Sequence, residues 1–288
     1  DWVFIKSSFA FSYFIGWSVT FTIIAYIFSL FNIKERGKLL YHKIIAKVCR
    51  RLVYIMINVK KKIINPQHEK FETPAIIIAN HQSSLDILPL IMLHPKLLMI
   101  TNNRIWNSPL FGKVIRMADY FPAEQIETDL SLVEDRVRNG YSVIIFPEGT
   151  RSEDGVINRF HKGAFYIAEK LNVDILPIMI HGTDYTLTKQ DQLLKDGQLT
   201  VKILPRIKPG DLTYGNGYAE RAKQVGHYFR QEFDGLKKEI EQPAYFREKL
   251  IYNYIYKGPV LEWYMRIKTR LEKNYQTFHE LVPMQGKI

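Results

Sequence analysis

The sequence predicts an α/β fold in which a mixed, mostly parallel sheet is flanked by helices. Short apolar runs bounded by polar turns suit strands that are buried on both faces. These runs alternate with longer stretches whose apolar residues recur at helical spacing, an order typical of α/β domains. A charge-free stretch near the N-terminus and an aromatic stretch near the C-terminus stand apart. They predict an N-terminal transmembrane helix and a C-terminal helical extension.

The alternation places each expected element in order along the chain. Strands are expected at 75–79, 97–101, 142–146, 175–180 and 199–204, and a strand followed by a loop at 59–71. Helices are expected at 39–57, 85–93, 109–117, 129–138, 161–171 and 218–240. After a boundary at Gln242-Pro243, two aromatic helices are expected at 245–257 and 260–281. We therefore expect a transmembrane helix in 1–32, one α/β domain in 33–241 and a helical extension in 242–288.

The composition of the chain indicates which kinds of molecule it binds more clearly than it indicates the fold. The chain has 288 residues, 47% of them hydrophobic, which is enough for one sizeable core with appendages. Its 40 lysines and arginines exceed its 29 acidic residues, and the net charge of +11 suits anionic lipid, a polyphosphate-bearing molecule or nucleic acid. No zinc finger or recognition helix is evident, so we expect no nucleic acid partner. The single cysteine, Cys49, excludes an intrachain disulfide, and the scattered histidines predict no metal site.

The N-terminal stretch has the length and composition of a membrane helix. No charged residue occurs from Ser7 to Phe31, and about 20 residues are enough to cross the hydrocarbon core of a bilayer. A signal peptide is the alternative, but the apolar run is too long and no small-residue cleavage site follows. By the positive-inside rule, the basic cluster that comes next predicts an inner membrane protein with its remaining chain on the cytoplasmic face. That cluster comprises Lys34, Arg36, Lys38, Lys43, Lys47, Arg50 and Arg51. The helix expected at 39–57 either lies on the membrane surface or packs on the sheet.

The residues that can carry chemistry begin where the strand expected at 75–79 ends. His81 follows that strand, and open α/β sheets bind ligands at the carboxyl edge of their strands. Asp86, in the first turn of the next helix, can reach back to the other ring nitrogen of His81. This geometry suits a general base, His81, whose tautomer Asp86 fixes. The alternative is a capping box from Ser83 to Asp86, in which the carboxylate only binds a backbone N–H.

A second polar turn follows the strand expected at 142–146. Its sequence, Pro147-Glu148-Gly149-Thr150-Arg151, combines a carboxylate, a glycine and a guanidinium. Arg151 has the planar donor geometry that binds a phosphate through two hydrogen bonds, and Gly149 lets backbone N–H groups approach an anion. The alternative is a surface turn in which Glu148 and Arg151 pair with each other. Because both polar turns end strands, together they indicate a site more strongly than either does alone.

With these two motifs the chain resembles the glycerolipid acyltransferase family that includes bacterial 1-acylglycerol-3-phosphate acyltransferases. The stretch from Asn80 to Asp86 matches its N-H-x4-D block, and the stretch from Phe146 to Arg151 matches its F-P-E-G-T-R block. Leu176-Pro177-Ile178 and the run from Phe160 to Phe165 are similar to two later stretches of the family. The resemblance covers roughly residues 40 to 240. It implies the α/β fold and a membrane-associated O-acyltransferase.

The resemblance also implies roles for individual residues. A fatty acyl group would pass from acyl-CoA or acyl carrier protein, as co-substrate, to a lysophospholipid hydroxyl without a further cofactor. His81 would be the base and Asp86 its orienter. The residues expected to bind the acceptor are Asn80, Glu148, Gly149, Thr150, Arg151 and Lys162. The chain departs from the family between Ala118 and Ala123, where an arginine assigned to acceptor binding is missing.

Two other functions are compatible with the sequence. A hydrolase could use His81 and Asp86, although the Gly-x-Ser-x-Gly nucleophile motif is absent. The other is a non-catalytic lipid-binding module of a transporter. The opening helix looks like the last helix of an MMPL-type transporter, and Gly286-Lys287-Ile288 looks like the approach to the first strand of a class I methyltransferase. The chain thus resembles part of a fusion of these proteins, and its start on Asp1 suggests a fragment. The acyl length, the donor carrier, the acceptor headgroup and the oligomeric state stay open.

Overall fold

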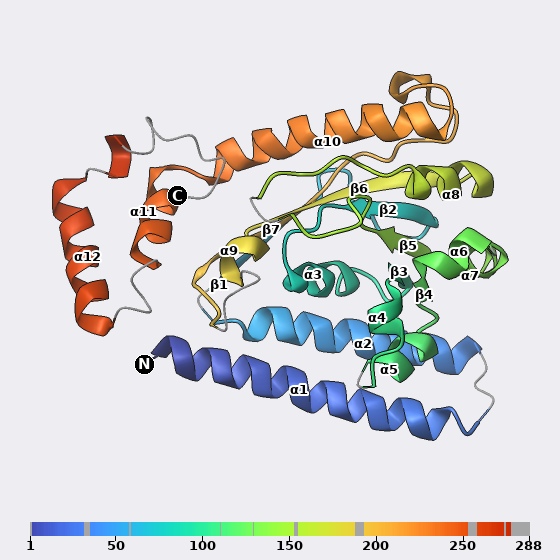
Figure 1. Cartoon of the computed structure of the whole chain (residues 1–288), viewed down its shortest axis with the longest axis horizontal. Coiled ribbons are helices and arrows are strands. Elements are labelled where there is room, and N and C mark those ends of the chain that lie inside the picture. The colour runs from blue at the N-terminus through green and yellow to red at the C-terminus, as the bar shows by residue number, and fades with distance from the viewer. Residues whose placement is uncertain are drawn as a thin grey trace.

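A seven-stranded sheet forms the centre of the computed structural model, which describes residues 2–31, 35–57, 59–109, 111–128, 130–152, 155–187, 193–252, 258–273 and 275–277 (Figure 1). The strand order is β1-β7-β6-β2-β5-β3-β4. Neighbouring strands run parallel except for β6 and β7, which pair antiparallel. The strands are β1 (Val59–Ile64), β2 (Ala75–Ala79), β3 (Leu97–Thr101), β4 (Phe121–Pro122), β5 (Ser142–Ile145), β6 (Asp174–His181) and β7 (Gly197–Ile203). The predicted mixed, mostly parallel sheet is confirmed.

Helices cover both faces of this sheet (Figure 1). α8 and α10 lie over one face, α2 and α3 lie over the other, and α1 lies beyond α2. Every residue of β2 and of β6 is buried between these layers, as the uninterrupted apolar runs predict. The helices are α1 (Trp2–Phe28), α2 (Glu35–Ile55), α3 (Ile87–Ile91), α4 (Asn103–Trp106), α5 (Gly112–Met117), α6 (Ala123–Thr128), α7 (Ser131–Arg138), α8 (Gly163–Leu171), α9 (Thr183–Thr186), α10 (Tyr218–Ile240), α11 (Pro243–Tyr252) and α12 (Pro259–Glu272), with the 3-10 helices η1 (Ser84–Asp86) and η2 (Leu212–Tyr214).

The strands and the longer helices lie close to their predicted positions. The short helices α4, α6 and α9 and the two-residue strand β4 are absent from the prediction, because so few residues do not show a period. Residues 253–257 and 278–288 lie outside the described part of the chain, and so does the methyltransferase-like ending. The domain limits at 32 and 241 stay predictions.

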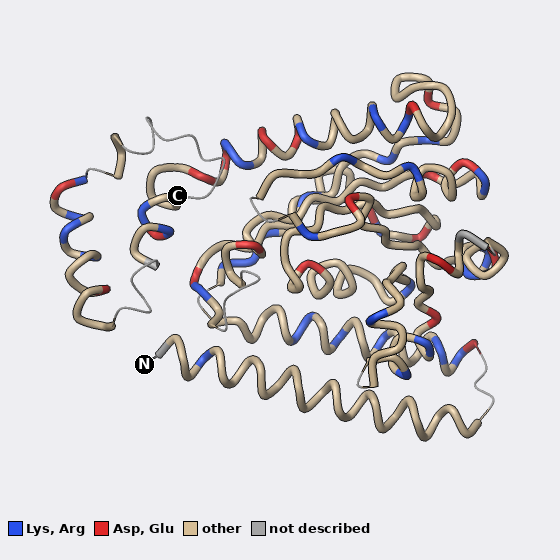
Figure 2. The backbone as a smooth tube through the Cα atoms, viewed as in Figure 1, with Lys and Arg blue, Asp and Glu red and all other residues tan. Residues whose placement is uncertain are grey.

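α1 is apolar almost throughout, and its two faces have different surroundings. Figure 2 shows it free of charged residues over nearly its whole length, and by length and composition it could cross a membrane. One face packs on the body of the protein, where Phe14 meets Phe111 and Phe21 meets Tyr41 edge to face. The opposite face leaves large apolar side chains exposed: Phe4, Ile5, Phe9, Ile15, Val19, Ile23, Tyr26, Ile27 and Phe28. Whether α1 spans a bilayer stays a prediction.

α2 packs against the sheet and α3, in agreement with one of the two alternatives drawn from the sequence. Tyr41, Leu52 and Val53 are buried in the main core. Leu40 and Tyr54 on the same helix are 59% and 55% exposed, so α2 also presents apolar side chains outward. Contact of α2 with a membrane surface therefore stays open beside its packing role.

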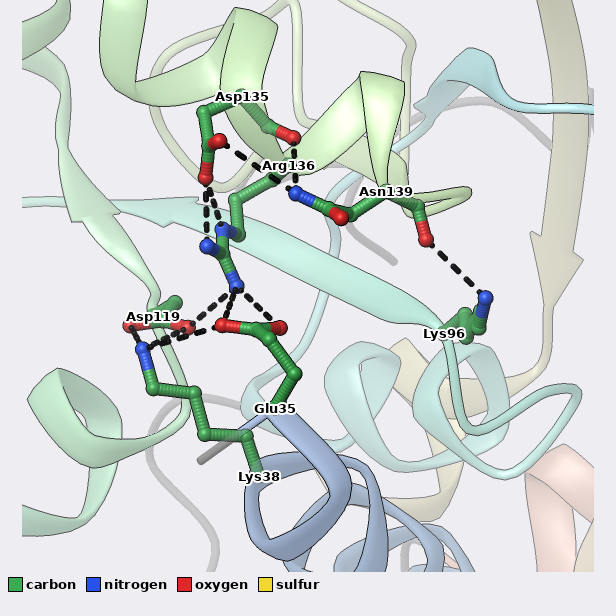
Figure 3. Close-up of polar contacts among 7 residues, drawn as sticks. All are labelled: Glu35, Lys38, Lys96, Asp119, Asp135, Arg136 and Asn139. Atoms are coloured by element: carbon green, nitrogen blue, oxygen red, sulfur yellow. Dashed lines mark hydrogen bonds and ion pairs between the residues drawn. The ribbon is translucent and has the colours of Figure 1, made fainter. Parts of the chain in front are cut away.

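A network of charged side chains closes the end of the molecule where α2 begins (Figure 3). The Arg136 guanidinium of α7 binds Glu35 at 3.0 Å and Asp119 at 3.2 Å, and it also binds its neighbour Asp135. The Lys38 ammonium of α2 binds Asp119 at 3.0 Å. The network thus ties α2 to α7 and to the turn between α5 and β4. The segment from Ala118 to Ala123 contains no arginine, and the network brings Arg136 next to it. The Arg136 guanidinium is already bound to carboxylates there.

Replacing Asp119 with Asn tests whether this network stabilises the fold. Asp119 has a φ of 50°, a left-handed conformation that Asn tolerates as well as Asp does, so the backbone is not the variable. Its side chain is 19% exposed and loses its charge contacts to Lys38 and Arg136. We expect the free energy of unfolding to fall by about 1–2 kcal/mol in urea titrations of the purified protein.

Asp135→Asn is the matched control. Asp135 binds the same guanidinium but is 59% exposed, so its replacement should change the free energy of unfolding by no more than about 0.5 kcal/mol. Equal effects of the two substitutions would contradict the stabilising role given to Asp119.

Candidate active site

Three neighbouring parallel strands bring the two sequence motifs to one edge of the sheet. β5, β2 and β6 lie side by side in the same direction, so their carboxyl ends meet. His81 follows β2, the turn from Phe146 to Arg151 follows β5, and the segment from Gly182 to Thr186 follows β6. Open parallel sheets bind ligands at this edge. The two polar turns therefore lie at one edge of the sheet, and a shared site there stays a prediction.

His81 and Asp86 form the hydrogen-bonded pair that the sequence predicts. His81 Nδ1 lies 2.9 Å from Asp86 Oδ2, which leaves the Nε2 atom of the ring to face a substrate. The imidazole stacks on the Phe146 ring at a centroid distance of 4.2 Å, so the second motif supports the first directly. The His81 side chain is 18% exposed, whereas that of Asp86 is fully buried. One partner can reach solvent and the other cannot, as a base and its orienter require.

The capping box is also present, so the two interpretations of Asp86 do not exclude each other. Asp86 Oδ2 accepts the backbone N–H groups of Gln82 and Ser83, each at 2.7 Å, as well as facing the imidazole. Ser83 in turn caps the N-terminus of η1. The other oxygen of Asp86, Oδ1, accepts a hydrogen bond from the hydroxyl of Thr183. These donors satisfy a carboxylate that would otherwise be costly to bury.

Glu148 joins the second motif to the first from inside the protein. Its two carboxylate oxygens accept the backbone N–H groups of His81 and Asn158, each at 2.8 Å, and the side chain is 3% exposed. Burial raises the pKa of Glu148 to about 7, although the two backbone donors act in the opposite direction. The Ser152 N–H also binds the His81 carbonyl, at 2.9 Å. Both oxygens of Glu148 therefore bind backbone groups of the protein, and contact of Glu148 with an acceptor stays a prediction.

Asn80 has a similar position inside the protein. Its amide donates to the Ile180 carbonyl and accepts the Ile180 N–H, both at 2.8 Å, and the side chain is fully buried. These two bonds fasten the end of β2 to β6. The expectation that Asn80 contacts the acceptor does not agree with this placement, because no part of its side chain reaches the surface.

The remaining predicted binding residues lie at the surface. Gly149, with a φ of 72°, and Thr150 are exposed, and Arg151 is half-buried. Within the described part of the chain no carboxylate pairs with Arg151, so the alternative of a Glu148–Arg151 surface pair is wrong. Lys162, just before α8, is exposed and lies over the ring of Tyr218. A guanidinium at a ligand-binding edge is a suitable partner for a phosphate.

A large apolar cavity lies beside the His81–Asp86 pair. Its volume is about 470 Å³, and its wall is built by α1, α2, α3, α5 and β3. The wall includes Ser84 and Leu85, which lie in the chain between His81 and Asp86. Phe14 of α1 and Cys49 of α2 line the same space. Sequence reasoning missed this cavity, because no single segment contains enough of its wall to show a pattern.

Comparison with known proteins agrees with this geometry. Residues 39–181 match the family model described as Acyltransferase. The chain is 33% identical over 150 residues to the chloroplastic 1-acyl-sn-glycerol-3-phosphate acyltransferase LPAT1 of Arabidopsis thaliana, covering 50% of this chain and 37% of that one. It is 36% identical over 138 residues to the chloroplastic enzyme BAT2 of Brassica napus, covering 46% and 40%. The aligned part is thus less than half the length of either relative.

A solved structure shares the fold. The crystal structure of the 1-acyl-sn-glycerophosphate acyltransferase PlsC from Thermotoga maritima superposes with a TM-score of 0.69 at 22% sequence identity, covering 82% of this chain and 96% of that one. At that identity the likeness establishes the fold alone.

Glu148→Gln tests the burial of the Glu148 carboxyl through the pH dependence of stability. The pKa of this group is about 7 in the folded protein against an ordinary 4.5. Its contribution to stability is therefore fully present below about pH 4.5 and is lost as the pH rises through about 7. From about pH 5 to about pH 8, the parent should lose about 1–3 kcal/mol of unfolding free energy relative to Glu148→Gln, measured by urea titration at both pH values.

The control for this comparison is Glu239→Gln. Glu239 lies on α10 with a side chain that is 62% exposed, so this variant should follow the parent at both pH values. A constant difference between the parent and Glu148→Gln would show that the carboxyl ionises as freely in the folded protein as in the unfolded one.

Proposed function

The chain belongs to the acyltransferase family, and on that premise we propose that it transfers a fatty acyl group from a thioester to the hydroxyl of a lysophospholipid related to 1-acylglycerol-3-phosphate. One observation carries the proposal. The hydrogen-bonded pair of His81 and Asp86 lies at the same edge of the sheet as the turn that presents Arg151, and Ser84 and Leu85, which lie between the two in the chain, line an apolar cavity. An enzyme that joins an acyl chain to a phosphate-bearing alcohol needs all three features in one place.

The geometry suits direct transfer without an acyl-enzyme. The acceptor hydroxyl attacks the thioester carbonyl carbon, a carbon–oxygen bond forms, and His81 Nε2 takes the hydroxyl proton. Asp86 stabilises the imidazolium through the 2.9 Å contact to Nδ1. The tetrahedral oxyanion then collapses, the carbon–sulfur bond breaks, and the departing thiolate takes the proton from His81. The base returns to its neutral form, and no redox partner or metal takes part in this sequence.

Arg151 and Lys162 are the residues proposed to hold the acceptor phosphate. A guanidinium can grip two phosphate oxygens at once, whereas an ammonium acts as a point charge. Arg151 follows Glu148 by three residues in a turn that Glu148 fastens to His81. A phosphate held there brings the glycerol hydroxyl of the same molecule toward the imidazole.

The cavity is the proposed site of the acyl chain. Its wall is mainly apolar, and the aromatic side chains of α1 and of Phe111, just before α5, contribute to it. Ser84 and Leu85 place one part of the wall next to the catalytic pair, where the thioester carbon must lie. The hydrophobic effect would hold a long acyl chain in this space. The donor is acyl-CoA or acyl carrier protein, either of which is acidic and suits a chain with a net charge of +11.

Membrane association is part of the same proposal. α1 both lines the cavity and exposes an apolar face, so lipid around α1 would lie close to the route into the cavity. We propose that the protein binds the inner membrane through α1, with the site on the cytoplasmic face. Oligomeric state and flanking segments are outside this proposal.

The hydrogen bonds of Ser83 make a serine hydrolase a less suitable alternative. The Ser83 hydroxyl donates to the Leu187 carbonyl at 2.8 Å and accepts the Leu85 N–H at 3.2 Å. It therefore caps η1 and does not face the imidazole as a nucleophile would.

His81→Ala is the first test of the proposed mechanism. The substitution removes the base but leaves β2 and the Asn80 and Glu148 backbone contacts in place. We expect transfer to a lysophosphatidate-type acceptor to fall by about 10²–10⁴-fold at unchanged far-UV circular dichroism. His227→Ala, on the exposed side of α10, should keep full activity. A folded His81→Ala protein with parental turnover would refute the base assignment.

Cys49→Phe tests the cavity as the acyl site. Cys49 is 8% exposed and lines the cavity, so a phenyl ring there shortens the available space. We expect kcat/KM for long-chain donors to fall about 10–100-fold relative to short-chain donors, measured with a series of acyl-CoA or acyl carrier protein thioesters.

Leu40→Phe is the control on the same helix. Leu40 is 59% exposed and lies outside the cavity, so the chain-length profile should not change. If Cys49→Phe lowers kcat/KM equally for every chain length, the cavity is not where the acyl chain lies.

A further inference from the structure

The two oxygens of the Asp86 carboxylate have separate partners. Oδ2 faces His81 Nδ1 and the backbone N–H groups of Gln82 and Ser83. Oδ1 accepts the hydroxyl of Thr183, which is the donor to that atom within the described part of the chain. Both Asp86 and Thr183 are fully buried. The orientation of the carboxylate therefore depends on donors from two different strand ends.

The backbone around Thr183 is built to bring this hydroxyl to Asp86. Thr183 is the first residue of α9, which follows β6 after the single residue Gly182. Gly182 has a φ of 90°, and a Cβ on it would lie 2.0 Å from the Gln198 carbonyl oxygen of β7. Only glycine fits there, so the chain turns sharply from β6 toward η1. The bonds between Asn80 and Ile180 hold the end of β6 against the end of β2.

The residue on the other side of Gly182 is also fixed. His181 Nε2 lies 2.8 Å from a Glu241 carboxylate oxygen at the end of α10, and both side chains are buried. This contact fastens the end of β6 to the end of α10. His181 thus belongs to the support of the strand, and Thr183 is the residue of this segment that contacts the catalytic pair.

We propose that Thr183 is a positioning residue, whose hydroxyl holds the Asp86 carboxylate in the rotation that presents Oδ2 to His81. The inference rests on the proposed function, because it assigns Thr183 a role only through the His81–Asp86 pair. A carboxylate with donors to one oxygen alone can turn about its last side-chain bond, since that torsion has broad minima. Thr183 removes this freedom and satisfies a buried oxygen that has no other donor among the described residues.

Thr183→Val, Thr183→Ser and Thr186→Val form the test set. Valine keeps the shape of Thr183 but removes the hydroxyl, and serine keeps the hydroxyl. Thr186 is the matched control, because it is equally buried on the same helix but donates to the Gly182 carbonyl at 2.8 Å. With acyl donor and lysophosphatidate-type acceptor, kcat per folded molecule should fall about 10–100-fold in Thr183→Val with little change in the acceptor KM. Serine should restore most of the loss, and Thr186→Val should retain parental kcat.

A pH profile separates positioning from simple damage to the fold. Two carboxylates face His81, namely Asp86 on η1 and Glu148 in the turn after β5, while Phe146 covers the ring with an apolar surface. Thr183 contacts Asp86 alone. Without the Thr183 hydroxyl the Asp86 carboxylate can turn away from His81 Nδ1, which weakens its hold on the imidazolium proton. In Thr183→Val the acid-side fall of kcat/KM should therefore move to lower pH, whereas a mere loss of folded protein lowers the profile without moving it.

The outcomes distinguish this inference from the proposed function. If His81→Ala abolishes transfer but Thr183→Val keeps parental kcat and pH profile, Thr183 does not position Asp86 and the base assignment stands. If Thr183→Val and Thr186→Val lose activity equally with unmoved profiles, both threonines only stabilise α9, which also overturns the inference. If folded His81→Ala retains transfer, the proposed mechanism itself is wrong.

Discussion

The site depends on one physical constraint, the burial of the Asp86 charge. An ionised carboxylate is costly to remove from water unless donors replace the lost hydration. Here two backbone N–H groups, the His81 ring and the Thr183 hydroxyl supply those donors. The donors come from the chain after β2 and the chain after β6, so the carboxylate is satisfied only when these two strand ends are side by side. The proposed catalytic geometry and the fold therefore depend on the same contacts.

The parallel arrangement of β5, β2 and β6 is held at this edge by side chains that face inward. Asn80 binds both backbone groups of Ile180, and Glu148 binds the N–H of His81. Because these residues fasten the backbone, the groups left at the surface are the His81 ring and the turn that carries Arg151. α1 adds the last component from outside the sheet, since it closes one side of the cavity with the face opposite its exposed apolar residues. The reacting groups are thus rigid, and lipid is proposed to lie near the cavity.

Much of this was predictable from sequence, for identifiable reasons. The strands stand out because residues buried on both faces form unbroken apolar runs, and His81, Asp86 and Arg151 stand out because they end such runs. The roles of Asn80 and Glu148 were not predictable, because a polar side chain in a motif looks the same whether it points to a substrate or to a backbone amide. Thr183 lies outside the two polar motifs, and only the left-handed turn at Gly182 brings it to Asp86. The pairing of Arg136 with Asp119 likewise needs the packing of α7.

The most direct test of the account compares the two products that a bound thioester can give. The protein, in vesicles that contain lysophosphatidate, receives a donor labelled in its acyl group, and the ester and the free fatty acid are counted against the thioester consumed. We expect ester to make up nearly all of the product from the thioester consumed, and its formation to stop when the acceptor is left out. Release of free fatty acid at the same rate with or without acceptor would contradict it in favour of a hydrolase. An intact thioester in the presence of both substrates would contradict it in favour of a lipid-binding module.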